Sequence, residues 1–123
     1  MRIACRARAA ALRTVTPEAI RILWLFVFFD LPVKTKPERR AATQFRNFLK
    51  DDGYMMLQYS VYARACRGED AVEKHVGRVI KRLPRAGSVR TLQVTERQYG
   101  RMRLLLGEAR KSEKLAAHQL VLL

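Results

Sequence analysis

An unbroken run of apolar residues constrains the fold of this chain more than any other feature. It covers Ile22–Phe29, is rich in aromatic and branched side chains, and is followed by Asp30 and Pro32. Such a short run favours a strand buried on both faces over a helix. It also falls far short of the roughly 20 apolar residues that span a bilayer. Because chemistry in open sheets tends to lie just beyond the carboxyl ends of strands, Asp30 is the first candidate functional residue.

The charge balance points to a polyanionic partner. The 123 residues include 25 Lys and Arg against 11 Asp and Glu, which gives a formal net charge of +14 at pH 7. On a single small domain this excess attracts polyanions. Nucleic acid is the leading class of partner because phosphate contacts supply most non-specific affinity. An anionic membrane surface ranks second, but no strongly amphipathic anchor helix stands out, so no membrane partner is predicted.

The cysteines and histidines predict neither a zinc site nor a disulfide framework. Cys5 and Cys66 form no Cys-x-x-Cys, and His75 and His118 form no His-Glu-x-x-His. A reducing cytoplasm is therefore the expected location. Cys66 is interpreted as a semi-buried apolar residue and His75 as a helix-surface residue.

A first helix is predicted after the apolar run. Thr35 is a suitable cap, Pro37 falls in the first turn, and Glu38 can return the capping bond. Gly53 is suited to the left-handed residue that ends a helix. One face is apolar at helical spacing and contains Ala41, Ala42, Phe45, Phe48 and Leu49. The opposite face is basic and contains Arg39, Arg46 and Lys50.

A second helix is predicted between Gly68 and Pro84. Its first turn repeats the capping-box spacing at Asp70 and Glu73. The apolar stripe consists of Val72, Val76, Val79, Ile80 and Leu83. The other face carries Lys74, Arg78, Lys81 and Arg85. A basic face usually serves solubility, but two such faces on one very basic protein favour nucleic-acid binding equally.

Three further stretches predict strands. Tyr54–Cys66 is β-prone, and the polar Gln58 and Ser60 indicate a kink or tight turn that splits it in two. Ser88–Glu96 alternates apolar and polar side chains. After a short turn or helical segment, Arg103–Leu106 is a candidate for another short strand.

The order of these elements predicts an α+β, ferredoxin-like split βαβ fold. Such a fold has an antiparallel sheet with both helices on one face, and its open face favours a homodimer through the sheets. Residues 21–107 are assigned to this domain. Residues 1–20 are a basic extension for which weak order is expected. Residues 108–123 are a tail whose apolar end is expected to pair with its own sheet or a partner's edge.

Three motifs on this pattern carry a resemblance. Phe28–Pro32 follows the first strand, Phe48–Tyr54 closes the first helix, and Gln58–Tyr62 reads Gln-Tyr-Ser-Val-Tyr. In this order the chain resembles the second of the two universal CRISPR-associated adaptation proteins, especially the versions from systems with a single large RNA-guided effector. The resemblance covers about residues 21 to 123.

The resemblance implies a homodimer in which Asp30 is both the catalytic residue and the ligand of Mg²⁺, with the two copies meeting at the dimer interface. It implies a role in spacer acquisition, as a Mg²⁺-dependent endonuclease on RNA or DNA, as a bridge that joins the adaptation integrase to a double-stranded prespacer, or as both. Metal-assisted cleavage needs several oxygen ligands. Within one chain Asp30 stands alone, because Glu38 is engaged at a helix start and Asp51 and Asp52 lie at the helix's far end.

Other positions carry over from the family more loosely. Phe29, Ser60 and Tyr62 would shape the loop beside the metal, although Phe29 lacks the hydroxyl that a Tyr would offer there. Arg39 and Arg40 approximately match basic residues early in the family's first helix. Together with the basic helix faces they give the predicted nucleic-acid-binding set: Arg39, Arg40, Arg46, Lys50, Arg78, Lys81, Arg82 and Arg85. A toxin-like ribonuclease, or a generic RNA-binding module of this fold without catalysis, is the alternative.

Overall fold

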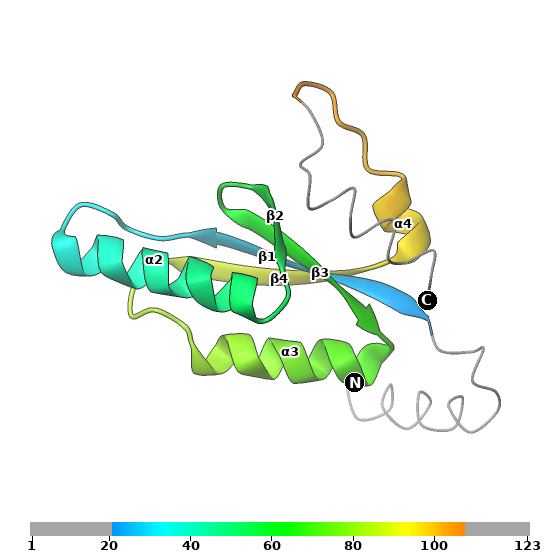
Figure 1. Cartoon of the computed structure of the whole chain (residues 1–123), viewed down its shortest axis with the longest axis horizontal. Coiled ribbons are helices and arrows are strands. Elements are labelled where there is room, and N and C mark those ends of the chain that lie inside the picture. Colours follow the sequence, from blue (N-terminus) through cyan, green and yellow to red (C-terminus); the bar gives the residue numbers. More distant parts are fainter. Residues whose placement is uncertain (1–20, 108–123) are drawn as a thin grey trace.

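A computed structural model describes residues 21–107 of the chain (Figure 1). The described strands form one antiparallel sheet of order β2-β3-β1-β4, which is the ferredoxin-like order and confirms the predicted fold class. The predictions for residues 1–20 and 108–123 lie outside the described part. The elements are β1 (Ile22–Asp30), α2 (Lys36–Asp51), β2 (Met55–Gln58), β3 (Val61–Arg67), α3 (Glu69–Lys81), β4 (Ser88–Thr95) and α4 (Glu96–Gly100).

The apolar run forms β1, which lies between β3 and β4 in the sheet. Successive side chains of a strand point to opposite faces. Leu23, Leu25, Val27 and Phe29 pack in the larger core, and Trp24 and Phe26 pack in a second cluster on the other face. Both faces of β1 are therefore buried, as predicted, and this explains why the run contains no polar residue.

Helices α2 and α3 cover the same face of the sheet (Figure 1). Helix α3 contributes Val72 and Val79 to the larger core. The predicted apolar stripe is wrong at its end, because Ile80 is 61% exposed and Leu83 lies beyond the helix. His75, and not Ile80, completes the buried stripe at helical spacing. The prediction that His75 lies on the surface is therefore wrong, because the residue is only 4% exposed.

The two helices begin differently. In α2 the predicted capping box is confirmed: Thr35 Oγ1 accepts from the Glu38 amide at 3.3 Å, and Glu38 Oε1 accepts from the Thr35 amide at 2.9 Å. In α3 the predicted cap at Asp70 is wrong, because the helix already starts at Glu69 and Gly68 occupies the cap position without a side-chain bond. The Gly68 amide donates to the Arg21 carbonyl at 2.8 Å, so the chain turns into α3 directly beside the start of β1.

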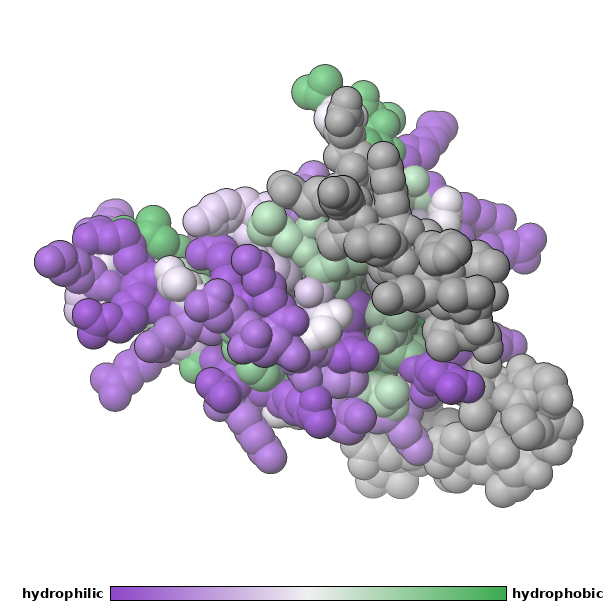
Figure 2. All heavy atoms as spheres, viewed as in Figure 1, coloured by the Kyte–Doolittle hydropathy of each residue, from purple (hydrophilic) through white to green (hydrophobic). Residues whose placement is uncertain are grey.

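The strand predictions hold except at the C-terminal side. Residues Tyr59 and Ser60 form the turn that separates β2 from β3, and Ser88–Thr95 forms edge strand β4. Arg103–Leu106 is not a strand, because none of the described strands pairs with it. Leu105 and Leu106 are 89% and 94% exposed. Figure 2 shows hydrophobic atoms at the top of the view, where this segment lies in Figure 1.

Helix α4 covers part of the second sheet face. The Tyr99 ring stacks on Trp24 with centroids 3.9 Å apart and 8° between the planes. The Trp24 indole N–H donates to Glu96 Oε2 at 2.8 Å. Cys66 lies in the core on the opposite face and is 2% exposed, so it is more deeply buried than predicted. Within the described residues, no helix is long and apolar enough to cross a membrane.

Candidate metal and nucleic-acid site

Asp30 is the last residue of the central strand, and its side chain is exposed. In the β1–β4 register it lies opposite Ser88. Its carboxylate makes no hydrogen bond or ion pair with any residue between 21 and 107. Because Asp30 neither caps a helix nor pairs with a cation within residues 21–107, its carboxylate is available to a ligand.

The main chain on either side of Asp30 is held tightly. Gly87 has φ +102°, and a Cβ there would lie 2.6 Å from the Asp30 carbonyl oxygen and 2.9 Å from Leu31 Cδ2. Only glycine allows this loop to approach so closely. The Phe29 amide donates to the Ser60 carbonyl oxygen at 3.1 Å. The loop before β4 and the β2–β3 turn therefore fix the end of β1 from two sides.

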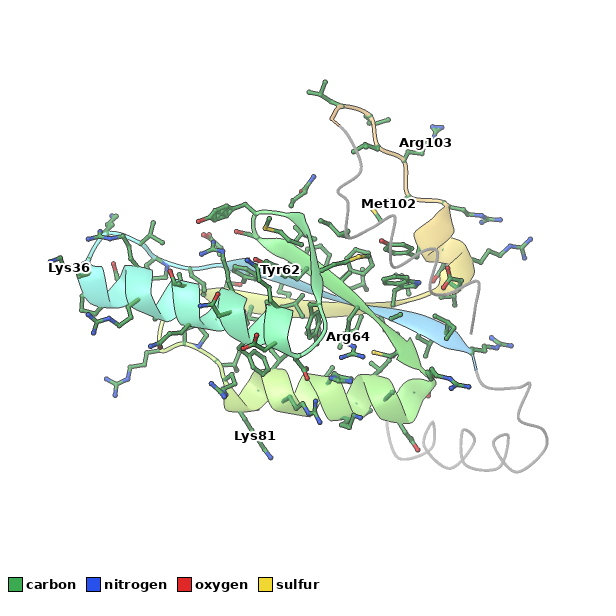
Figure 3. All side chains as sticks on the ribbon, in the orientation of Figure 1. Lys36, Tyr62, Arg64, Lys81, Met102 and Arg103 are labelled. Atoms are coloured by element: carbon green, nitrogen blue, oxygen red, sulfur yellow. The ribbon has the colours of Figure 1, made fainter. Side chains whose placement is uncertain are left out.

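The residues predicted to shape the loop beside the metal support the backbone next to Asp30. Phe29 is buried, with its ring edge-on to Phe45 at 5.2 Å and 5.6 Å from the Tyr62 ring. Tyr62 is fully buried on β3 (Figure 3). Ser60 contributes its carbonyl oxygen. These contacts position the backbone that carries the carboxylate.

One chain supplies only part of a metal site. Among the described residues, no group of three or more His, Cys, Asp or Glu side chains is placed to hold a metal ion. Mg²⁺ is usually bound through one or two carboxylates, with water and substrate phosphate oxygens as its other ligands. The single exposed carboxylate of Asp30 fits such a site as one of its protein ligands.

The eight predicted nucleic-acid-binding residues fall into two groups. Four make contacts within the chain: Arg39 donates to the Val33 and Lys34 carbonyls, Arg46 stacks on two rings, Arg78 pairs with Asp52, and Arg82 lies over Phe48. The other four are exposed and have no partner among residues 21–107: Arg40, Lys50, Lys81 and Arg85. In Figure 3 Lys81 extends away from the body at the end of α3, and in Figure 2 hydrophilic side chains dominate over α2 and α3.

Sequence reasoning missed a second acidic centre at Asp52. Its carboxylate is 2.8 Å from His75 Nδ1 and accepts from the Arg78 guanidinium at 2.6 Å. Arg64, which Figure 3 shows between the end of α2 and α3, donates to the Asp52 carbonyl and lies 3.5 Å from His75 Nδ1. The Asp52 and His75 side chains are only 7% and 5% exposed. This network joins α2, β3 and α3, and each carboxylate oxygen of Asp52 has a side-chain partner in it.

The environment shifts both titratable groups of the network. Burial alone would raise the pKa of Asp52, but its hydrogen bonds with His75 and Arg78 lower the pKa below the usual value. Burial lowers the pKa of His75, and the nearby Arg64 charge adds to this, although the Asp52 hydrogen bond opposes it. The sequence did contain a signal that His75 is buried: its spacing from Val72 and Val79 places it on the apolar stripe of α3.

The central strand of this ferredoxin-like domain ends in a carboxylate that has no partner among residues 21–107, and its helices carry exposed cations. Both features are typical of small proteins that process nucleic acids. The family model described as "CRISPR associated protein Cas2" matches residues 23–102. The chain therefore belongs to the Cas2 family, as the resemblance predicted.

Curated relatives named "CRISPR-associated endoribonuclease Cas2" support this assignment. The protein from Acidovorax ebreus is 55% identical over 83 residues, which cover 68% of this chain and 81% of that protein. The protein from Flavobacterium psychrophilum is 43% identical over 88 residues, 72% of this chain and 76% of its own length. The protein from Paracidovorax avenae is 43% identical over 99 residues, 80% of this chain and 92% of its own length. These names agree with the prediction of a nuclease.

Proposed function

We propose that this protein acts in CRISPR spacer acquisition as a homodimer that binds nucleic acid and cleaves phosphodiester bonds with Mg²⁺. The observation that carries the proposal is the exposed Asp30 carboxylate, which has no partner among residues 21–107 and lies at the end of a strand fixed from two sides. The proposal extends to this chain what the names of its relatives say of them, an endoribonuclease activity associated with CRISPR.

A second copy of the chain completes the proposed site. One Asp30 is too few for a nuclease centre, whereas a two-fold axis near the end of β1 supplies the carboxylate twice. The sheet face that carries Phe28 and the exposed Leu92, together with the exposed Leu104–Leu106, offers apolar surface for such an interface. Burial of this surface in a dimer removes it from water.

In the reaction, the two Asp30 side chains would hold the metal, and the exposed Arg40, Lys50, Lys81 and Arg85 would bind other phosphates of the same nucleic acid. When bound, Mg²⁺ lowers the pKa of a water and stabilises charge on the phosphate oxygens. Phe29 has no hydroxyl and takes no part in proton transfer. Its bond to Ser60, together with the close approach of Gly87, keeps the carboxylate-bearing backbone in place.

The same basic face supports the second part of the proposal, a bridge that joins the adaptation integrase to double-stranded DNA. Phosphate contacts by exposed cations are insensitive to sequence. A generic RNA-recognition module is less favoured, because such modules stack bases on exposed aromatics of the central strands. Here Trp24 and Phe26 are only 1% and 8% exposed.

Cleavage of labelled RNA and DNA tests the catalytic part. We expect wild-type cleavage to require Mg²⁺ and to be abolished in Asp30→Ala. The exposed acid Asp51, at the far end of α2, is the control, and Asp51→Ala should remain active. When wild-type and Asp30→Ala chains are mixed equally and exchanged, a shared site retains about one quarter of the activity, whereas independent sites retain about half. Full cleavage by Asp30→Ala contradicts the assignment.

Duplex binding in EDTA tests the bridging part. We expect affinity to fall steeply with salt, and Arg40→Gln or Lys81→Gln each to reduce the slope of log K against log salt by about 0.9. Arg97→Gln, on α4 and on the opposite sheet face, is the control and should leave the slope unchanged. A pull-down of the integrase by the wild-type protein tests the partner. Duplex affinity that does not change with salt concentration contradicts the proposal.

A further inference from the structure

The β2–β3 turn places an exposed aromatic ring beside the candidate site. Tyr59 is 64% exposed, whereas Phe29 and Tyr62 are buried. The Arg46 guanidinium carbon lies 4.0 Å from the Tyr59 ring centroid and 5.3 Å from that of Phe29. Arg46, predicted as a phosphate contact, is thus half-buried between two rings and presents the Tyr59 ring to solvent.

The position of this ring is fixed relative to Asp30. Arg46 Nε donates to the Tyr59 carbonyl oxygen at 3.4 Å, so the same side chain holds both the ring and the main chain of the turn. The neighbouring Ser60 carbonyl accepts from the amide of Phe29, the residue directly before Asp30. Because the ring is already held in place, little side-chain freedom remains to be lost when a ligand binds to it.

The chemistry of an exposed ring at this place fits a nucleic-acid base. Unpaired bases stack on aromatic side chains, and the interaction tolerates any sequence because every base has a π face. We propose that Tyr59, held by Arg46, is a stacking platform for an unpaired base of the nucleic-acid strand whose phosphate lies at Asp30. This inference rests on the proposed function and adds that the bound strand is unpaired next to the reacting phosphate.

Binding measurements in EDTA test the platform without cleavage. The first probe is a duplex with a single-stranded overhang that contains 2-aminopurine, made as RNA and as DNA, and the second is the same duplex with abasic overhang positions. We expect Tyr59→Ala to bind the base-bearing overhang about 5- to 150-fold more weakly than wild type. Its affinity for the abasic probe should be unchanged. The probe, RNA or DNA, on which wild type and Tyr59→Ala differ in affinity identifies the type of strand that binds.

Two further variants separate stacking from a role in holding the turn. Tyr59→Phe keeps the flat ring and should match wild type within about twofold, whereas Tyr59→Leu keeps apolar bulk and should behave like Tyr59→Ala. Stacking quenches 2-aminopurine, so its fluorescence should fall on binding to wild type and Tyr59→Phe but not to Tyr59→Leu. Thermal melts check that each variant is folded.

The outcomes distinguish this inference from the proposed function. Equal affinity of wild type, Tyr59→Ala and Tyr59→Leu for the base-bearing probe overturns the platform and leaves the proposed function standing. An equal loss on both probes also overturns it, because the ring then only supports the turn. Failure of the wild-type protein to bind either probe defeats the proposed function together with the platform.

Discussion

Asp30 and Asp52 occupy comparable places, each at the end of a regular element, but their surroundings are opposite. Asp30 follows β1, is exposed, and has no side-chain partner among the described residues. Asp52 follows α2, is 7% exposed at its side chain, and is bonded by His75 and Arg78. Asp30 can therefore still bind a ligand, whereas the carboxylate of Asp52 is already bonded to α3 and joins it to the end of α2.

The comparison shows that the position of an acid at an element end does not determine its role. A buried carboxylate is tolerated only when its oxygens are satisfied, and it then stabilises the fold. An exposed carboxylate without a partner contributes little to stability. The expected effects of substitution are therefore reversed at the two sites, in activity at Asp30 and in stability at Asp52.

The largest expected effect is on catalysis at Asp30. Asp30→Asn preserves the shape of the side chain but removes the charge that holds the metal, so Mg²⁺-dependent cleavage should be lost. Its free energy of unfolding should stay within about 0.5 kcal/mol of wild type, because no contact in the described chain is lost. Cleavage assays and denaturant unfolding measure the two quantities. A marked loss of stability in this variant would break the comparison.

The next effect is on stability at Asp52. Asp52→Ala leaves His75 and Arg78 without their acceptor, and removal of one partner from a buried pair costs about 3–5 kcal/mol. We expect the lower end of this range, because the Arg78 side chain is 51% exposed. Asp51→Ala, at the adjacent exposed acid, is the control and should change stability by no more than about 0.5 kcal/mol. Equal unfolding free energies for the two variants would contradict the assigned role of the network.

Local sequence signals were sufficient for most of the fold. The eight apolar residues of β1 and the Thr35–Glu38 capping box are contained in short segments, and both were predicted correctly. Asp30 was also found locally, because it ends the apolar run. Its lack of a partner could not be predicted, since that depends on which side chains the fold brings near the strand end.

The errors arose where distant residues meet. His75 can be buried because the Asp52 carboxylate, 23 residues away, accepts from its Nδ1–H at 2.8 Å. The predicted phosphate contacts remain predictions, but the fold shows that four of them also have partners within the chain. Arg46 is the clearest case, because its two ring partners lie on β1 and on the β2–β3 turn. Composition shows that cations are abundant, but only the fold shows which of them are free.

A smaller effect is expected at Gly53, directly after Asp52. Its φ is +91°, and a Cβ would lie 2.8 Å from Arg64 Nη1, which is itself held by the Asp52 carbonyl. Gly53→Ala should therefore cost about 1–3 kcal/mol, from backbone strain and from displacement of Arg64. Gly77→Ala is the matched control, because no atom lies within 4 Å of its Cβ. It should stabilise α3 by up to about 1 kcal/mol. In denaturant unfolding, the two variants should therefore change the free energy of unfolding in opposite directions.

The smallest expected effect is the pH dependence of the Asp52 network. Because the pKa of His75 is lowered in the folded protein, the unfolded chain takes up the proton first as pH falls below about 6.5. Stability from neutral His75 is therefore present above this pH and lost below it, by at most about 1.4 kcal/mol per pH unit. The lowered pKa of Asp52 acts in the same direction, but only below its usual value of 3.8.

His75→Asn separates the two contributions, because the Asn amide can donate to Asp52 but does not titrate. Urea unfolding between pH 7.5 and 5 should show a shallower loss of stability in this variant than in wild type. Identical pH slopes in the two proteins would mean that His75 is not held neutral by its burial, and that the Asp52 centre is less closed to water than the contrast with Asp30 requires.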